Sequence, residues 1–348
     1  MSYRLFIPGG VLLLMSLIVL KSIAPSLFFF QLLWIVLGLG AMLFFVFLDP
    51  RIVTASPRLL WGFYGFVFVL LLVSLLSPTV RETQSWIRFG VFNFQPVELM
   101  KISLILLFAY YFSRRHVEIG IWSTIVISFL LVILPIGVVA LQPDLGSALI
   151  LGATWFGFLL LSGLPWKRLA VMIVLLVIGL FFMWQFILRG YQKERIMNVF
   201  YPEQHALTFN YNVIQSKIAI GSAGWWGKGY GQGSQVQAGF LPEAQTDFIF
   251  AALVEEWGWI IGTLVIGCFL WFMLEILKIG QNADQNVERF ICLGTVVMLL
   301  IQFFLNIGSV LGISPVIGVP FPLLSYGGSS LVTLLLLLGI IHGISLRS

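Results

Sequence analysis

The chain has 348 residues, of which 60% are hydrophobic and only 9% are charged, and its net charge is +5. A soluble domain typically carries about 25% charged residues. The composition therefore excludes a soluble globular protein, because too few charges are available to cover a water-facing surface. The apolar residues fall in long runs, and about 20 of them in a row cross the hydrocarbon core of a bilayer. The sequence predicts an integral membrane protein.

Ten apolar runs predict about ten transmembrane helices, since a lipid-exposed span must satisfy its own backbone hydrogen bonds. The first run is too long for the apolar core of a signal peptide and more runs follow it, so we interpret it as a retained helix. The predicted fold class is all-α, with a single polytopic membrane domain over 1–348. The runs lie near 5–23, 27–48, 59–77, 96–113, 121–141, 146–163, 168–188, 248–277, 290–312 and 328–345.

The Lys and Arg residues between the runs predict the orientation, because short cytoplasmic segments carry an excess of positive charge. The short loops on one side hold only Lys21, Arg81 and Arg88. Both termini are then expected in the cytoplasm, and topology rather than nucleic-acid binding explains the basic balance. The cytoplasmic set is Arg4, Arg51, Arg58, Arg114, Arg115, Lys167, Arg168, Lys278, Arg289 and Arg347.

Two segments on the predicted outer side are candidates for a functional surface. Residues 189–246 form the longest hydrophilic segment, a large extracytoplasmic loop between the seventh and eighth helices. Loops of that length are usually functional or disordered, and its tryptophans and glycines are not typical of disorder. The segment 313–327 is also external and rich in Gly and Pro. Together the two segments are expected to form a site on the outer face.

Charged residues inside predicted spans need an explanation, because burying charge in a membrane is costly and such residues are usually functional. Glu98 and Lys101 open the fourth span three residues apart, so they share one helix face. They form either a mutual ion pair at the membrane edge or a polar site in a cavity. Glu255 and Glu256 point about 100° apart on a helix. Either both are interfacial, or at least one faces a cation or a wet cavity.

Two aspartates stand where external loops meet predicted helices. Asp247 precedes an apolar run, which is typical of an N-cap or first-turn acid. It can also be a carboxylate placed to act as a general base, and both interpretations can hold at once. Asp144, in QPDLG, is typical of a turn and a helix start. The glycine-rich segment 221–233 contains Lys228. Such backbone can cradle an anion, but tight turns explain the glycines as well.

Other site chemistries lack their signatures in the sequence. His116, His205 and His342 are scattered without the spacing of metal ligands. No GxSxG nucleophile elbow occurs, which argues against acyl transfer. Cys268 and Cys292 both lie in apolar runs and predict no disulfide.

Six strings in order along the chain resemble the SEDS family, which includes RodA of cell elongation and FtsW of cell division. The short termini and the string GVPFP resemble RodA more than FtsW. Two positions depart from the family pattern: Val97 stands where Ser is usual, and Ala223 where Gly is usual. The strings are WIRFGVFNFQPVELMK (86–101), QPDLGSA (142–148), YQKERI (191–196), YNVIQSKIAIGSAGWWGKG (211–229), FLPEAQTDFIFAALVEEWG (240–258) and FFLNIGSVLGISPVIGVPFPLLSYGGSS (303–330).

The resemblance implies a peptidoglycan glycosyltransferase of the bacterial cytoplasmic (inner) membrane, which polymerises lipid II at the outer face during cell elongation. It implies Asp247 as the essential catalytic acid and a class B penicillin-binding protein, a transpeptidase, as partner through spans eight and nine. Cofactors are expected to be none or a divalent cation such as Mg or Mn. The residues expected to bind the substrate are Glu98, Lys101, Gln215, Lys228, Glu243 and Ser325.

Two other functions fit a ten-span bundle with charges in its spans. A lipid II flippase would need a site near the midplane that is reached from both sides, whereas most of the polar residues singled out here lie at the outer face. A non-catalytic scaffold for a penicillin-binding protein would tolerate loss of Asp247. It would fail when lipid-facing residues of spans eight and nine change.

Overall fold

The structure is a computed structural model, which describes residues 3–47, 56–77, 84–89, 92–115, 121–188, 190–200 and 210–347. Arg51 and Arg81 of the charge count, and residues 189 and 201–209 of the large loop, lie outside these ranges. The described part contains nine helices long and apolar enough to cross a membrane, and a shorter apolar one of 17 residues. Each overlaps one predicted run, which confirms the helical multi-span fold. They are α1 (Tyr3–Ile23), α2 (Pro25–Phe47), α4 (Pro57–Ser74), α5 (Pro96–Arg115), α6 (Trp122–Leu141), the shorter α7 (Leu145–Leu161), α8 (Trp166–Phe182), α12 (Ile249–Asn282), α13 (Asn286–Leu311) and α14 (Gly328–Ser345).

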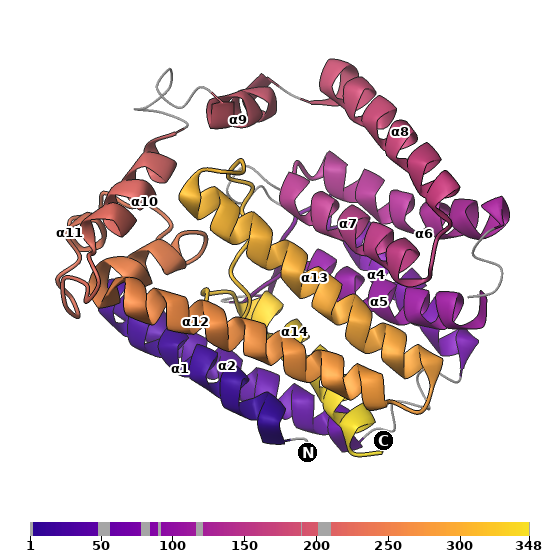
Figure 1. Cartoon of the computed structure of the whole chain (residues 1–348), viewed down its shortest axis with the longest axis horizontal. Coiled ribbons are helices and arrows are strands. Elements are labelled where there is room, and N and C mark those ends of the chain that lie inside the picture. The colour runs from indigo at the N-terminus through magenta and orange to yellow at the C-terminus, as the bar shows by residue number, and fades with distance from the viewer. Residues whose placement is uncertain are drawn as a thin grey trace.

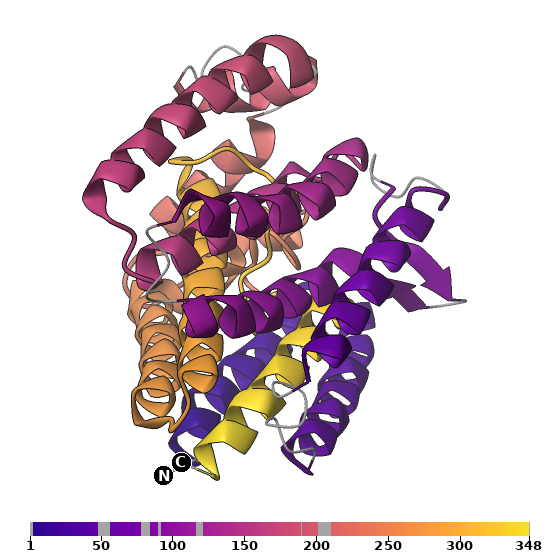
Figure 2. The ribbon, with the colours of Figure 1, turned by 90° about the vertical axis from the view of Figure 1, so that its right-hand side faces the viewer.

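The helices form a bundle in which α5 is central and α8 is peripheral. Most residues of α5 are buried, whereas α8 lies along the edge of the bundle and buries none of its residues against the protein (Figure 1). Both ends of the chain lie together at one end of the bundle (Figures 1 and 2). An even number of membrane crossings likewise brings both ends of the chain to the same side. The large apolar side chains exposed on the outer helices provide the surface that lipid would cover.

Helices α2 and α14 approach each other closely through small residues. A Cβ atom added to Gly339 would lie 2.5 Å from the carbonyl oxygen of Met42. Small residues let helix backbones come this close, and in membranes such packing drives helix association. The pair holds α14 beside α2, so the starts of both helices lie at the same end of the bundle.

A short β-hairpin, which the sequence pattern does not predict, precedes α5. Strands β1 (Ile87–Phe89) and β2 (Phe92–Phe94) pair antiparallel, with Ile87 opposite Phe94 and Arg88 opposite Asn93. The hairpin leads into the first turn of α5.

The predicted large loop contains helices of its own. These are α9 (Gly190–Phe200), α10 (Tyr211–Ser222) and the four-residue α11 (Ser234–Gln237). Helices α10 and α11 lie at the end of the bundle away from the chain termini (Figure 1). The glycine-rich segment between them packs against α12.

Helix α12 is broken at Gly258, where φ is +81°. The break deprives two carbonyl groups and two N–H groups of their partners in the helix, and buried backbone groups must be paired. The segment 224–229 pairs all four, so its glycines serve as close-packed backbone. The bonds run from Lys228 N–H to Glu255 O (2.9 Å), Gly229 N–H to Glu256 O (2.9 Å), Trp259 N–H to Gly224 O (3.1 Å) and Ile260 N–H to Trp225 O (3.3 Å).

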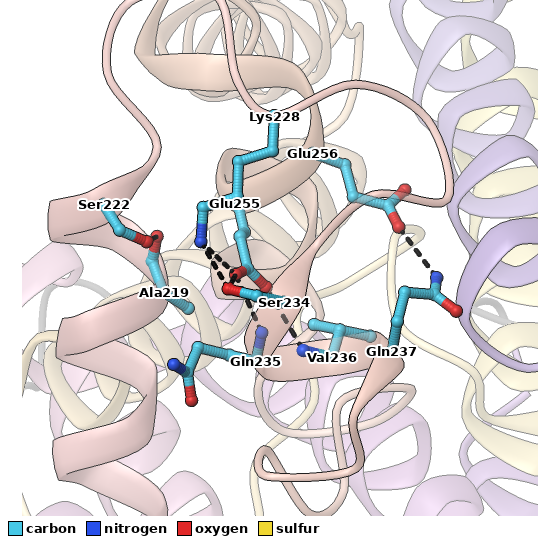
Figure 3. Close-up of polar contacts among 9 residues, drawn as sticks. All are labelled: Ala219, Ser222, Lys228, Ser234, Gln235, Val236, Gln237, Glu255 and Glu256. Atoms are coloured by element: carbon cyan, nitrogen blue, oxygen red, sulfur yellow. Dashed lines mark hydrogen bonds and ion pairs between the residues drawn. The ribbon is translucent and has the colours of Figure 1, made fainter.

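The two adjacent glutamates of α12 are both buried and point to different partners (Figure 3). The Glu255 carboxylate accepts bonds from Lys228 Nζ (2.7 Å) and from the backbone N–H groups of Gln235 and Val236. Glu256 Oε1 accepts from Ser22 Oγ at 2.7 Å. The prediction that at least one glutamate faces a cation is confirmed. The anion cradled by Lys228 is thus a carboxylate of the protein itself, and we call this arrangement around Glu255 the clasp.

Candidate functional site

A cavity of about 1000 Å³ lies at the end of the bundle where α2, α5, α7, α12 and α14 begin. Its wall includes residues from the first turns of α2, α5, α7 and α14 and the segment 312–320, which follows α13. The cavity is also lined from the large loop, by Gln192 of α9 and Lys217 of α10. By the predicted orientation this end faces outward, so both external segments expected to form a site contribute to one cavity.

Asp247 lines this cavity and immediately precedes the N-cap residue of α12, Phe248. It is therefore neither the N-cap nor a first-turn residue, and that structural explanation of Asp247 is wrong. A Cβ atom added to Gly318 would lie 3.9 Å from Asp247 Oδ2, so the carboxylate sits beside the segment 312–320.

The backbone carbonyl groups of Gln245, Thr246 and Asp247 each accept a hydrogen bond. One donor lies in α13 and the other two lie in the segment between α13 and α14. Asn306 Nδ2 donates to Asp247 O at 2.9 Å and also to Val319 O at 2.8 Å. The other two bonds run from Ser325 Oγ to Thr246 O (2.6 Å) and from Tyr326 N–H to Gln245 O (2.9 Å). The backbone that carries Asp247 is therefore fixed at three successive residues, and we call these three bonds the carbonyl clamp.

Glu243 also lines the cavity and stands in a strained backbone conformation. Its φ of +54° is left-handed, which is uncommon for a residue with a side chain. Its Oε2 atom accepts a bond from Thr246 Oγ1 at 2.9 Å. Glu243 thus belongs to the same turn as Asp247 and helps to hold that turn in place.

Glu98 and Lys101 form a buried ion pair on the cavity wall, with 2.7 Å between Oε2 and Nζ. The two alternatives from the sequence therefore hold together, since the residues pair with each other and face a cavity. A small side cavity adjoins the same pair and is lined by Ser325. Removing one partner would leave an uncompensated buried charge, which is strongly destabilising.

Asp144 caps α7, as the helix-start prediction requires. Its Oδ1 accepts from Ser147 N–H at 3.0 Å, and its Oδ2 accepts from Ser147 Oγ and from Gln95 Nε2. Asp144 and Gln95 both lie on the cavity wall. The carboxylate therefore joins the starts of α5 and α7.

The residues expected to bind substrate do not all line the main cavity. Glu98, Lys101 and Glu243 line the main cavity, whereas Gln215 and Lys228 do not. Lys228 is engaged in the clasp. Ser325 lines only the side cavity and bonds to the Asp247 turn through the carbonyl clamp. The substrate-binding roles of all six remain predictions.

Two residues that the sequence analysis did not single out belong to the site. Lys217 lines the cavity, and Asn306 holds the backbone of Asp247. Lys217 appeared in the sequence as one of several loop cations, and Asn306 is a polar residue inside an apolar run. Asn306 could have been identified from the sequence, because a polar side chain within a span requires a partner.

The donor set of the described residues does not fit a metal held by the protein alone. Within these ranges no group of three His, Cys, Asp or Glu side chains is arranged to hold an ion. Mg²⁺ is commonly held by one or two carboxylates together with substrate phosphates, so a metal would have to share its ligands with the substrate. The divalent cation stays a prediction.

Comparison with known proteins gives relatives over nearly the whole chain. The cell cycle protein family of FtsW, RodA and SpoVE matches residues 3–348. The peptidoglycan glycosyltransferase MrdB of Escherichia coli is 36% identical over 89% of this chain and 83% of its own. The stage V sporulation protein E of Bacillus subtilis is 34% identical over 91% of this chain and 87% of its own.

Solved structures show the same fold. A chain of a peptidoglycan synthase complex, described as coordinating polymerization and crosslinking, has a TM-score of 0.87 at 28% identity, covering 99% of this chain and 97% of that one. The rod shape determining protein RodA of Thermus thermophilus has a TM-score of 0.73 at 26% identity, covering 99% and 96%. The chain therefore belongs to the cell cycle protein family of FtsW, RodA and SpoVE.

Proposed function

We infer that the chain is a peptidoglycan glycosyltransferase and a multi-pass bacterial membrane protein. Relatives that carry this activity in their names cover most of the chain. The observation that carries the inference to the site is the position of Asp247, a carboxylate fixed by its backbone on the wall of a 1000 Å³ cavity. The cavity lies at the end of the bundle that the charge pattern places outside.

The proposed substrate is lipid II, a disaccharide-peptide joined through a diphosphate to a polyprenyl chain. Asp247 takes the proton from a sugar hydroxyl of the acceptor as that oxygen attacks the anomeric carbon of the donor. The new glycosidic bond forms as the bond between that carbon and the diphosphate oxygen breaks, so the configuration inverts. The leaving group is a polyprenyl diphosphate, and cationic side chains stabilise the charge that develops on it.

The proposed partner is a class B penicillin-binding protein, whose transpeptidase activity would cross-link the new strand. Likeness to a chain from a synthase complex that combines polymerization and crosslinking supports such an assembly. The finer proposal is that the single membrane helix of the partner packs near α12 and α13. A role in elongation is proposed because MrdB and a rod shape determining protein are among the relatives that the chain resembles.

The test is polymerisation of purified lipid II by the wild type and by Asp247→Asn, with and without the candidate transpeptidase. The substitution keeps the shape of the side chain and removes the base. We expect polymer from the wild type and a loss of about a hundredfold or more in the variant, as for a general base. Near-wild-type polymerisation by the variant would remove Asp247 from the mechanism. If neither protein makes polymer even with the partner, a lipid II translocation assay tests the flippase, and the scaffold remains the other alternative.

A further inference from the structure

We propose that Lys217 binds the diphosphate group of the lipid-linked substrate. The proposal rests on the proposed function, because that function supplies a diphosphate ligand. It assigns the phosphate contact to a residue of α10 and not to Lys228 in the glycine-rich segment. Three observations support it: the pairing of the lysines, the way Lys217 is seated, and the charges of the cavity.

The three lysines that could bind the diphosphate differ in whether they already form an ion pair. Lys101 is buried in an ion pair with Glu98. Lys228 is bound by Glu255 in the clasp and does not line the cavity. Within the described ranges of the chain, Lys217 is the one lysine or arginine that lines the cavity without an ion pair. Its charge is therefore available to a ligand.

The side chain of Lys217 lies against the end of α13. Gly312 terminates that helix in the left-handed conformation, with φ of +71°. A Cβ atom added to Gly312 would lie 2.6 Å from both Cε and Nζ of Lys217, so the lysine crosses the bare face of the glycine. The preceding residue, Ser216, donates from Oγ to Val310 O at 2.8 Å and ties α10 to α13. These contacts place α10, and with it Lys217, against the end of α13 on the cavity wall.

The charges of the cavity restrict where an anion can enter. Its wall carries four carboxylates among the described residues and two lysines. Lys101 is neutralised by Glu98, so Lys217 is the cation among these residues whose charge can attract an anionic diphosphate. Lysine is a common phosphate ligand. The carboxylates are Glu98, Asp144, Glu243 and Asp247.

The segment 312–320 connects the proposed phosphate contact to the proposed base. Lys217 lies against Gly312, and Asp247 lies against Gly318. Five residues of chain separate the two glycines, so their Cα atoms are at most about 22 Å apart. One substrate molecule can therefore place its diphosphate at the Lys217 end of this segment and its sugar toward the Asp247 end.

The test compares Lys217→Gln and Lys217→Arg with the wild type in nanodiscs, using the full chain. For lipid II polymerisation we expect the KM of Lys217→Gln to rise about tenfold to a hundredfold, as for the loss of a charged hydrogen bond, and Lys217→Arg to keep most of the affinity. Binding of farnesyl diphosphate and of farnesol is measured in parallel. The wild type should prefer the diphosphate, and Lys217→Gln should lose that preference.

Lys193→Gln is the matched control, because it removes another lysine of the same loop, one that does not line the cavity. We expect it to keep the preference for farnesyl diphosphate. Discs of neutral lipid and discs with phosphatidylglycerol separate a diphosphate site from a headgroup site. A wild type without preference, a Lys217→Gln variant that keeps it, or a preference lost whenever phosphatidylglycerol is present would overturn the proposal. If the wild type makes no polymer yet shows the Lys217-dependent preference, the proposed function fails and the phosphate contact stands.

Discussion

At the scale of the residue, the carbonyl clamp determines where the proposed base sits. A general base works only within hydrogen-bond reach of the proton it removes, and small misplacements of catalytic groups are costly. Asn306 is the central member, because its single Nδ2 group joins Asp247 O to Val319 O and so links the turn before α12 to the segment 312–320. We therefore regard Asn306 as a positioning residue.

Replacing Asn306 with Asp tests this role. The new side chain has the same shape but presents an acceptor to two carbonyl oxygens, so both bonds are lost, each worth about 1 kcal/mol or more when buried. We expect kcat for lipid II polymerisation to fall at least about tenfold while KM changes little. Asn286→Asp, an exposed site at the other end of α13, is the control and should retain the wild-type kcat. An Asn306→Asp variant with wild-type kcat would show that the clamp does not position the base.

Residue roles were predictable only where the residue type itself carries the signal. Glu98 and Lys101 stood out because charge within a membrane span is costly, and Asp247 was singled out by the family resemblance. The choice between Lys217 and Lys228 was not predictable, since both are lysines of one glycine-containing loop. What separates them is the pairing of Lys228 with Glu255, 27 residues further along the chain. Nothing in the local sequence specifies that contact.

At the scale of the element, the break in α12 makes the large loop part of the bundle. A continuous helix would satisfy its own backbone, and the segment 224–229 would have no polar groups to bind there. With the break at Gly258, that segment supplies the missing partners, and the clasp adds the buried Glu255. The loop is thereby attached to the same helix that Asp247 precedes.

Gly258→Ala should disrupt this attachment. A Cβ atom at this position would overlap the carbonyl of Trp225, and the left-handed φ is strained for alanine. We expect a loss of roughly 2–4 kcal/mol in stability, seen as a lower melting temperature in detergent. Gly267→Ala in the same helix is the control, because its Cβ would meet open space. It should be neutral or stabilising by up to about 1 kcal/mol. Equal melting temperatures for the two variants would contradict the role of the break.

The helices that coincide with long apolar runs were predictable from the sequence. All ten predicted spans correspond to helices, since backbone in lipid has few alternatives. The hairpin of β1 and β2 is too short to give a period, and the break at Gly258 lies inside an apolar run that continues on both sides. Both depend on tertiary contacts, so the sequence pattern alone does not reveal them.

At the scale of the whole molecule, the bundle exposes large apolar side chains that lipid or a partner helix must cover. Leu264 of α12 is 61% exposed and Phe304 of α13 is 64% exposed. The two helices pack against each other, and they are the spans to which the resemblance assigns the partner. Neither residue lines the cavity, so binding of a partner there can be separated from the chemistry.

Leu264→Trp makes that separation measurable. The larger ring remains compatible with lipid but overfills a packed helix contact, and overpacking typically costs 1–3 kcal/mol. We expect co-purification with the class B penicillin-binding protein to fall about tenfold, and Phe304→Ala to weaken it by removing a contact. The matched control is Leu43→Trp on α2, which is 53% exposed and should leave the complex intact. Polymerisation by the chain alone should be equal in all three variants. If Leu43→Trp weakens the complex as much as Leu264→Trp does, the partner helix does not lie at α12 and α13, and the proposed interface moves to another face of the bundle.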